Sequence, residues 1–121
     1  MHEANEESAT APTAARVFAL LWAELHDVMG SAATAALLRR AAKHARDRAP
    51  ELGGFEVQRA RFEYRYVVPQ TWTEGPRPSL DALMQELRPL LVELTGPVVL
   101  KRLHRVPELQ SCGHFSPEVV T

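Results

Sequence analysis

Residues 79–97 read SLDALMQELRPLLVELTGP, and this stretch carries the clearest structural signal in the sequence. Its apolar side chains recur at helical spacing and form one stripe, made by Leu80, Leu83, Met84, Leu87, Leu91 and Leu94. We expect Ser79 to cap the helix start and Gly96 to end the helix, because serine accepts a backbone N–H and glycine adopts left-handed conformations. Pro89 falls opposite the stripe, which predicts a solvent-facing bend rather than a break.

A shorter helix is predicted after Pro97, because proline is favoured in the first turn of a helix. Its inward residues would be Val99, Leu100, Leu103 and Val106, and its outward residues Lys101, Arg102 and Arg105. Pro107 would end it. Residues 110–121, which include Cys112 and His114, are expected to form an irregular tail.

Two helices are predicted nearer the N-terminus. Residues 1–12 are acidic and polar, which predicts a disordered leader. From Thr13 an apolar helical face begins, made by Val17, Phe18, Leu21, Trp22, Leu25, Val28 and Met29. Gly30 is expected to end this helix and Ser31 to cap the next, which would run from about 32 to 48. The inner stripe of that second helix would hold Leu37, Leu38, Ala41 and Ala45, and the short link predicts a helical hairpin.

Residues 55–68 change to the alternating pattern of a half-buried β-strand. The inner face would carry Ala60, Phe62, Tyr64, Tyr66 and Val68, and the outer face Arg59, Arg61, Glu63, Arg65 and Val67. Phe55 and Val57 are apolar in the opposite phase, which indicates either a bulge near Gln58 or a separate short strand before it. Residues 70–73 are interpreted as a brief return strand.

The predicted fold class is therefore α+β: a helical hairpin, a short β-strand or hairpin, a Pro-bent helix and a short helix, in one domain over residues 13–109. Such a small strand unit leaves unpaired N–H and C=O groups along its edge. We expect a homodimer that pairs through the strand region. A hairpin sealed by helices, or a partner protein that adds a strand, are the alternatives.

Composition limits the class of protein. The formal net charge is −1, so no bulk attraction to nucleic acid or to an anionic membrane is expected. No apolar run reaches the length of a membrane span, and the first residues do not resemble a secretory signal. The single cysteine, Cys112, can form no internal disulfide, so a cytoplasmic location is expected.

The sequence contains no recognisable catalytic motif. Glycine-rich phosphate loops, nucleophile elbows and dinucleotide fingerprints are absent from it. Cys112 and His114 lie close together in the sequence, but a closed zinc site needs four ligands. The usual ligand spacings, such as Cys-x-x-Cys or His-x-x-x-His, do not occur in this sequence. His26 and Asp27 diverge by about 100° on a helix, so they cannot form a dyad. We therefore predict no catalytic residues, no metal and no cofactor.

The preferred interpretation is a non-enzymatic regulatory or adaptor module that acts by protein–protein contact. One alternative is a nucleic-acid-binding regulator that uses two basic faces, formed by Arg39, Arg40, Lys43, Arg46, Arg59, Arg61 and Arg65. A second alternative is a sensor of a small hydrophobic ligand with an aromatic pocket, formed by Phe18, Trp22, Phe62, Tyr64, Tyr66 and Trp72. Trp72 is also expected to be partly exposed as a contact residue.

Overall fold

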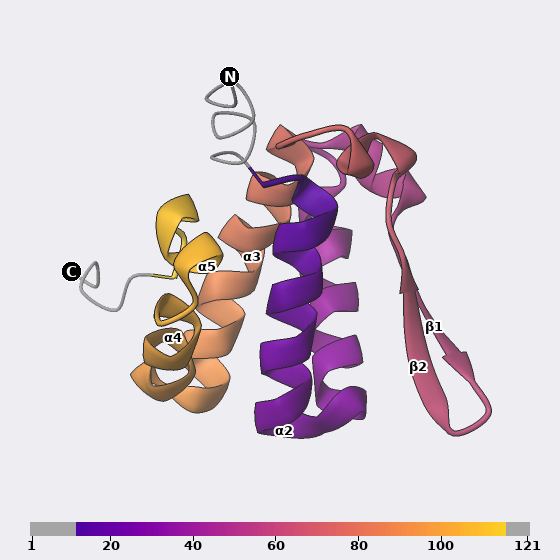
Figure 1. Ribbon diagram of the computed structural model, residues 1–121. Helices are drawn as coiled ribbons and strands as arrows, with labels where there is room; N and C mark the ends of the chain where they lie inside the picture. Colours follow the sequence, from indigo (N-terminus) through magenta and orange to yellow (C-terminus); the bar gives the residue numbers. More distant parts are fainter. Residues whose placement is uncertain (1–11, 116–121) are drawn as a thin grey trace, which may run out of the picture.

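The computed structural model describes residues 12–115, and it confirms the predicted α+β class (Figure 1). In chain order the elements are α2 (Ala14–Ala45), η1 (Pro50–Gly54), β1 (Glu56–Ala60), β2 (Glu63–Val67), η2 (Gln70–Thr73), α3 (Pro78–Thr95), α4 (Pro97–His104) and α5 (Pro107–Cys112). The α-helices pack as one group, and the β-hairpin runs alongside α2. The predicted leader lies outside the described residues, apart from Pro12.

Element α2 consists of two helical segments that reverse direction at Gly30, as the sequence predicts. Gly30 has φ 84° and ψ 171°, a backbone conformation that residues other than glycine rarely adopt. The side-chain hydrogen bond at this turn comes from the buried Thr34, whose hydroxyl donates to the Gly30 carbonyl oxygen at 2.7 Å. The two segments together form the predicted helical hairpin, and their inner faces provide Phe18, Leu21, Leu25 and Leu38 to the core.

Helix α3 supplies the opposite wall of the core. Leu80, Leu83, Met84, Leu87 and Leu91 are buried, while Leu94 at the end of the stripe is 59 % exposed. The helix continues through the exposed Pro89, and Gly96 follows it with φ 68°. The predicted cap is wrong, because the helix begins at Pro78 and Arg77 occupies the cap position. The Ser79 hydroxyl instead donates to the Glu51 carboxylate.

The C-terminal part is more regular than predicted. Pro107 follows α4 but begins a further helix, α5, which extends to Cys112. Phe115 is fully buried, His114 Nε2 lies 2.9 Å from Asp81 Oδ1, and Arg88 donates to the His114 carbonyl oxygen at 2.9 Å. The irregular tail predicted from residue 110 is therefore wrong for residues 110–112, which belong to α5. Residues 113–115 have no regular secondary structure but are packed on the fold, and residues 116–121 lie outside the described range. Sequence analysis missed the burial of Phe115, because a single apolar residue in a polar stretch shows no helical or strand periodicity.

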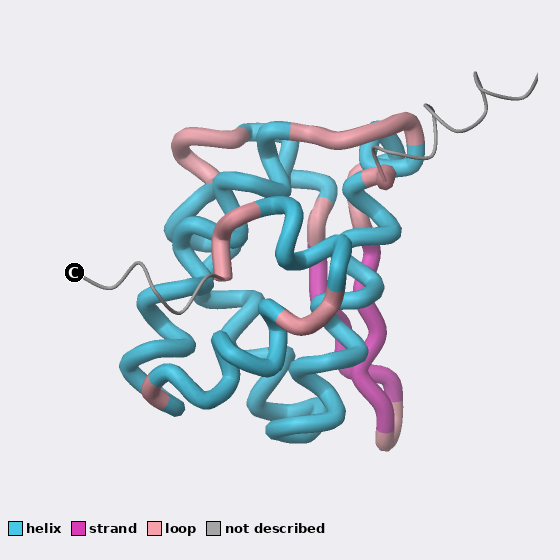
Figure 2. The backbone as a smooth tube through the Cα atoms, turned by 60° about the vertical axis from the view of Figure 1, so that its left-hand side comes forward, coloured by secondary structure: helices cyan, strands magenta, loops and turns pink. Residues whose placement is uncertain are grey.

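The strand region is an antiparallel hairpin of β1 and β2 (Figure 2). Of the two alternatives predicted near Gln58, a bulge or a separate short strand, the structure has a separate strand, but the break lies at residues 61–62, inside the predicted main strand. Ala60 pairs with Glu63, which leaves a two-residue connection of Arg61 and Phe62. Arg61 has φ 59°, a value that two-residue hairpin connections usually assign to glycine or asparagine. The reversal excludes Phe62 from the inner face, where the sequence predicted it, and leaves its side chain 93 % exposed. The predicted return strand at residues 70–73 is also wrong, because this segment forms the 3-10 helix η2.

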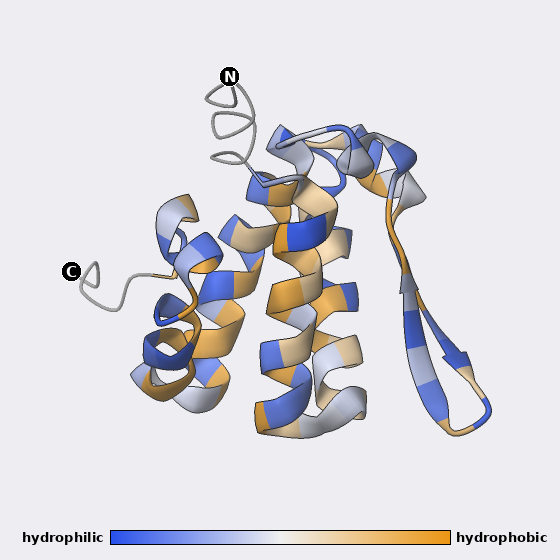
Figure 3. Ribbon diagram, viewed as in Figure 1, coloured by the Kyte–Doolittle hydropathy of each residue, from blue (hydrophilic) through white to orange (hydrophobic). Residues whose placement is uncertain are grey.

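Aromatic rings join the hairpin to the helices. The Phe18 ring lies 4.7 Å from Tyr66, 5.2 Å from Phe55 and 5.8 Å from Trp72, measured between ring centroids. Trp72 is fully buried, so its predicted exposure is wrong, and its Nε1 donates to the Ser79 hydroxyl at 2.8 Å. Figure 3 shows the result in hydropathy: apolar residues gather between the helices, and the outer part of the hairpin is hydrophilic.

Candidate functional site

The two edges of the hairpin differ in whether their backbone groups are bonded. In an antiparallel pair joined by a two-residue connection, the pair next to the turn exchanges hydrogen bonds, and the pattern then alternates. The N–H and C=O groups of Val57 and Arg59 therefore point away from β2, and those of Tyr64 and Tyr66 point away from β1. These outward groups decide whether another strand can pair with either edge.

Arg39 occupies one acceptor on the β1 edge, the Val57 carbonyl oxygen. Its guanidinium donates twice to the Val57 carbonyl oxygen, from Nε at 3.2 Å and from Nη2 at 2.9 Å. This contact joins the second segment of α2 to the edge of β1, and it confirms that the Val57 carbonyl points outward. A strand that approached β1 would have to displace a charge-assisted hydrogen bond.

The β2 edge is open. Within residues 12–115, no backbone hydrogen bond joins the outward groups of Tyr64 or Tyr66 to another element. Both tyrosine side chains are half-buried on the inner face, and the residues between and beside them, Glu63, Arg65 and Val67, are exposed on the outer face. The hairpin therefore presents a regular, unpaired strand edge to solvent, and natural proteins usually protect such edges.

Arg39 also takes part in a small aromatic–cation cluster, defined here as Arg39, Arg59 and Tyr64. The guanidinium carbons of Arg39 and Arg59 lie 5.8 and 5.9 Å from the centroid of the Tyr64 ring. The sequence placed Arg59 on the outer face, but the reversal at residues 61–62 puts it directly opposite Tyr64 on the inner face. The cluster holds two cations near one ring, and each such contact is worth about 0.5–1 kcal/mol at an exposed site.

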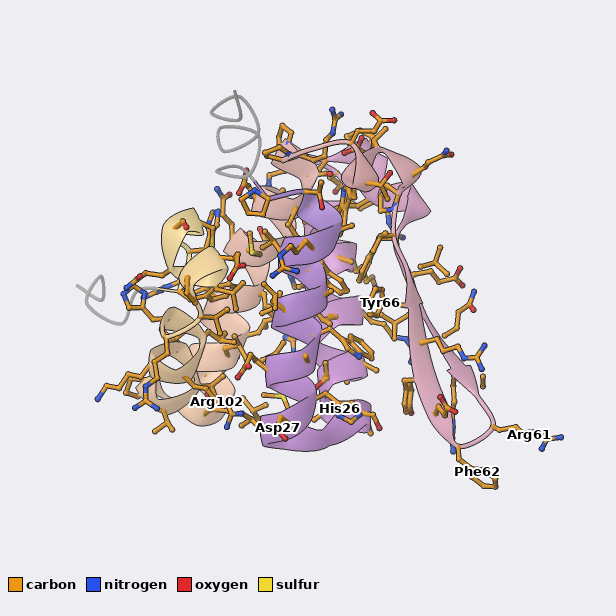
Figure 4. All side chains as sticks on the ribbon, viewed as in Figure 1. His26, Asp27, Arg61, Phe62, Tyr66 and Arg102 are labelled. Carbon is orange, nitrogen blue, oxygen red and sulfur yellow. The ribbon has the colours of Figure 1, made fainter. Side chains whose placement is uncertain are left out.

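The predicted basic faces converge in part. Arg39, Lys43 and Arg46 line one groove together with Phe55, Glu56 and Val57. Arg59 joins them through the Tyr64 ring, whereas Arg65 lies on the outer face of β2 and Arg61 at the tip (Figure 4). Between residues 12 and 115, no ion pair involves any of the seven predicted nucleic-acid contacts. Four other arginines are paired with carboxylates: Arg16, Arg48, Arg77 and Arg102.

The structure brings together only some of the residues of the predicted ligand pocket. The rings of Phe18, Trp22, Tyr66 and Trp72 contact one another, so they fill the space that they were expected to surround. Tyr64 belongs to the cation cluster, and Phe62 extends from the hairpin tip, away from the helices (Figure 4). A different cavity of about 200 Å³ lies between the start of α2, α3 and α5, and its lining includes Val17, Leu80, Met84 and Cys112.

The groups considered for catalysis have other contacts. Arg102 donates to Glu24 at 2.8 Å and to Asp27 at 2.5 Å, so Asp27 serves to join α4 to α2. Cys112 is half-buried, its thiol donates to the Leu109 carbonyl oxygen, and burial raises the pKa of that thiol. In the part of the chain that the structure describes, no three His, Cys, Asp or Glu side chains meet as metal ligands would.

Glu51 is a carboxylate that accepts several side-chain hydrogen bonds, and sequence reasoning missed it. It accepts hydrogen bonds from the Ser79 and Thr71 hydroxyls, and Arg77 donates to it at 3.0 Å. These donors favour the ionised form, the Ser79 hydroxyl most strongly, and lower the pKa of Glu51 to about 2. The cluster holds η1, η2 and the start of α3 together, which is a structural role.

Comparisons of the chain with protein families, curated proteins and solved structures find no match. Among the described residues, none of the helices is both long enough and apolar enough to cross a membrane.

Proposed function

We propose that the protein is a non-enzymatic regulatory or adaptor module that binds other polypeptides through the open β2 edge. The observation that carries this proposal is the difference between the two edges: Arg39 occupies the outward Val57 carbonyl of β1, whereas no backbone partner among residues 12–115 bonds the outward groups of Tyr64 and Tyr66 on β2. An extended segment can add to such an edge, where main-chain hydrogen bonds supply affinity and alternate side chains supply specificity.

The partners of this module are polypeptides with an extended segment, and a second copy of the chain is one of them. The proposal places the module in the cytoplasm, because its single cysteine can form no internal disulfide and reducing conditions suit an unpaired thiol. Catalysis has no part in the proposal, since Cys112 and Asp27 are held by structural contacts.

A photo-crosslinking experiment tests the proposal. A photoreactive amino acid replaces Arg65, which is exposed on β2, in cells that produce the protein. The matched control replaces Gln58, the exposed residue paired with Arg65 across the hairpin on strand β1. We expect polypeptide adducts from position 65 at several times the yield from position 58. Equal yields from the two positions, or no polypeptide adduct at 65, would refute the proposal.

A second candidate function is nucleic-acid binding, and the unpaired cations of the groove favour it. Lys43 and Arg46 lie beside Arg39 without a carboxylate partner among the described residues, so phosphates could approach them. Lys43→Glu with Arg46→Glu leaves the Arg39–Val57 contact in place and removes the two groove cations. Lys101→Glu with Arg105→Glu makes the same charge change elsewhere and serves as the control.

Binding of random-sequence duplex DNA and of single-stranded RNA, measured at several salt concentrations, distinguishes the two functions. If the groove binds phosphates, the groove variant loses about tenfold or more in affinity, and the slope of log K against log salt falls by about 0.9 for each lost contact on duplex DNA. Equal binding by the groove variant and its control would exclude this candidate.

A further inference from the structure

We propose that the β2 edge pairs with the β2 edge of a second copy, antiparallel, around a twofold axis at Tyr64. This inference deepens the proposed function and rests on it, because it specifies one partner and one register for the same edge. The result would be a four-stranded sheet in the order β1–β2–β2–β1, in which neither β2 edge remains exposed.

The outward backbone groups restrict the possible registers. Two antiparallel edges bond only when outward-pointing residues face one another, so Tyr64 and Tyr66 of one copy must lie opposite outward residues of the other. A twofold axis within the strand can then lie at residue 64, 65 or 66. Registers shifted by one residue from these would place the outward N–H of one strand opposite an inward N–H of the other, so no ladder of hydrogen bonds would form.

Charge selects among these three registers. With the axis at Tyr64, Glu63 of each copy lies opposite Arg65 of the other, which makes two pairs of opposite charge. With the axis at residue 65, Arg65 lies opposite itself, and directly opposed like charges destabilise a sheet. With the axis at Tyr66, Glu63 lies opposite Pro69, and Arg65 opposite Val67, so neither charge has a partner.

Glu63 and Arg65 have no such pairing within one copy. Both are exposed on the outer face, and their neighbours across the hairpin are the uncharged Ala60 and Gln58. Among the described residues, neither forms an ion pair. A strand in which a negative and a positive side chain flank the axis residue is complementary to its own antiparallel copy.

The same register gives the exposed tip a contact. Residue 62 of each copy lies opposite residue 66 of the other, so the exposed tip of each hairpin lies beside the end of the partner's β2 strand. Phe62 is 93 % exposed in a single copy, whereas Tyr66 is half-buried against Phe18 and Trp22.

Charge reversal in the full-length chain tests the register, with the oligomeric state measured by sedimentation equilibrium and multi-angle light scattering. Glu63→Arg alone, or Arg65→Glu alone, places two pairs of like charge in the dimer. We expect each to raise the dimer dissociation constant by about tenfold or more. The double variant, Glu63→Arg with Arg65→Glu, restores opposite charges and should return the constant to within about threefold of the wild-type value.

Glu56→Arg is the control, because it makes the same charge change on the outer face of β1, away from the proposed pairing, and should leave the dissociation constant unchanged. Circular dichroism verifies that each variant keeps its helices. A wild-type chain that stays monomeric up to millimolar concentration, single variants without effect, or a double variant without recovery would each overturn the inference. If it fails while position 65 still crosslinks to another polypeptide, the proposed function stands without the dimer. If position 65 crosslinks to nothing, the proposed function fails.

Discussion

Cys112 shows how burial controls reactivity at the scale of one residue. Its side chain is half-buried beside Leu109, whose carbonyl oxygen accepts the thiol hydrogen bond. Burial raises the pKa of the thiol, because the thiolate is less well solvated there than in water. The thiolate is the form that attacks electrophiles, so the folded chain should keep this cysteine unreactive at neutral pH.

We predict that iodoacetamide alkylates Cys112 at pH 7.5 at least severalfold more slowly in the folded chain than in the same chain unfolded in urea. The raised pKa lowers the thiolate fraction, and the half-buried position limits access. Mass spectrometry of samples taken over time measures both rates. Equal rates in the two states would contradict the prediction.

Arg61 carries the backbone strain of the hairpin. Among the described residues other than glycine, it is the one with positive φ, at 59°. Left-handed backbone costs an L-residue about 1–2 kcal/mol, and glycine avoids that cost but loses more freedom on folding. Arg61→Gly should therefore raise the free energy of unfolding by up to about 1 kcal/mol. Urea denaturation of wild type and variant measures the difference.

Phe62→Gly is the comparison for that prediction. Phe62 is the other residue of the connection, and it lacks positive φ, so glycine there removes no strain and should give no gain in stability. A gain at residue 62 equal to that at residue 61 would show that strain at Arg61 is not the cause.

At the scale of elements, Glu51 holds three segments in place. It lies in η1, and its donors come from η2 and from the segment that begins α3. Ser79 is 4 % exposed, so its hydroxyl has few other partners if the carboxylate is lost. Loss of a hydrogen bond to a charged group costs about 1.5–3 kcal/mol, which sets the expected effect of Glu51→Ala at pH 7.

The pH dependence of that contribution follows from the lowered pKa. The folded-state pKa of Glu51 is about 2, against 4.5 for the free group. The folded state therefore favours the ionised form, and this stabilisation is complete above about pH 4.5 and is lost as the pH falls toward 2. Glu51→Gln should reduce the fall in the free energy of unfolding over this window, as measured by urea titration at each pH.

Glu93→Gln provides the matched change at an exposed position of α3. It should leave the pH dependence close to that of the wild type. If the two glutamine variants behave alike between pH 4.5 and 2, the hydrogen bonds to Glu51 are not the source of the acid sensitivity.

At the scale of the whole molecule, one aromatic cluster joins the helices to the hairpin. Phe18 contacts rings from β2, η2 and the residue before β1, and it is fully buried. Phe18→Ala should lower the free energy of unfolding by about 3–5 kcal/mol, because it removes buried surface and leaves a cavity. A small domain has only about 5–15 kcal/mol in total, so this variant should be close to unfolding.

Phe62→Ala removes the same side chain from an exposed position. It should change the stability of the monomer by less than about 0.5 kcal/mol, because this ring is exposed among residues 12–115. Urea denaturation at a concentration where the chain is monomeric compares the two variants. Equal losses at residues 18 and 62 would contradict the assignment of one ring to the core and the other to solvent.

The sequence alone determined the α+β class, the helical hairpin, the Leu stripe of α3 and the turns at Gly30 and Gly96. These features are local: a helix or strand shows its apolar period within a few turns, and glycine and proline mark ends through their own backbone limits. Other features follow only from the three-dimensional fold: the burial of Trp72, the exposure of Phe62, the packing of Phe115 and the hydrogen bonds from Arg39 to the Val57 carbonyl oxygen. Most of these features depend on contacts between residues 7 or more positions apart in the sequence. The exposure of Phe62 depends on the chain reversal at Arg61, a residue other than glycine that has positive φ. A periodic pattern reports which face of an element is apolar, but it does not report which element will cover that face.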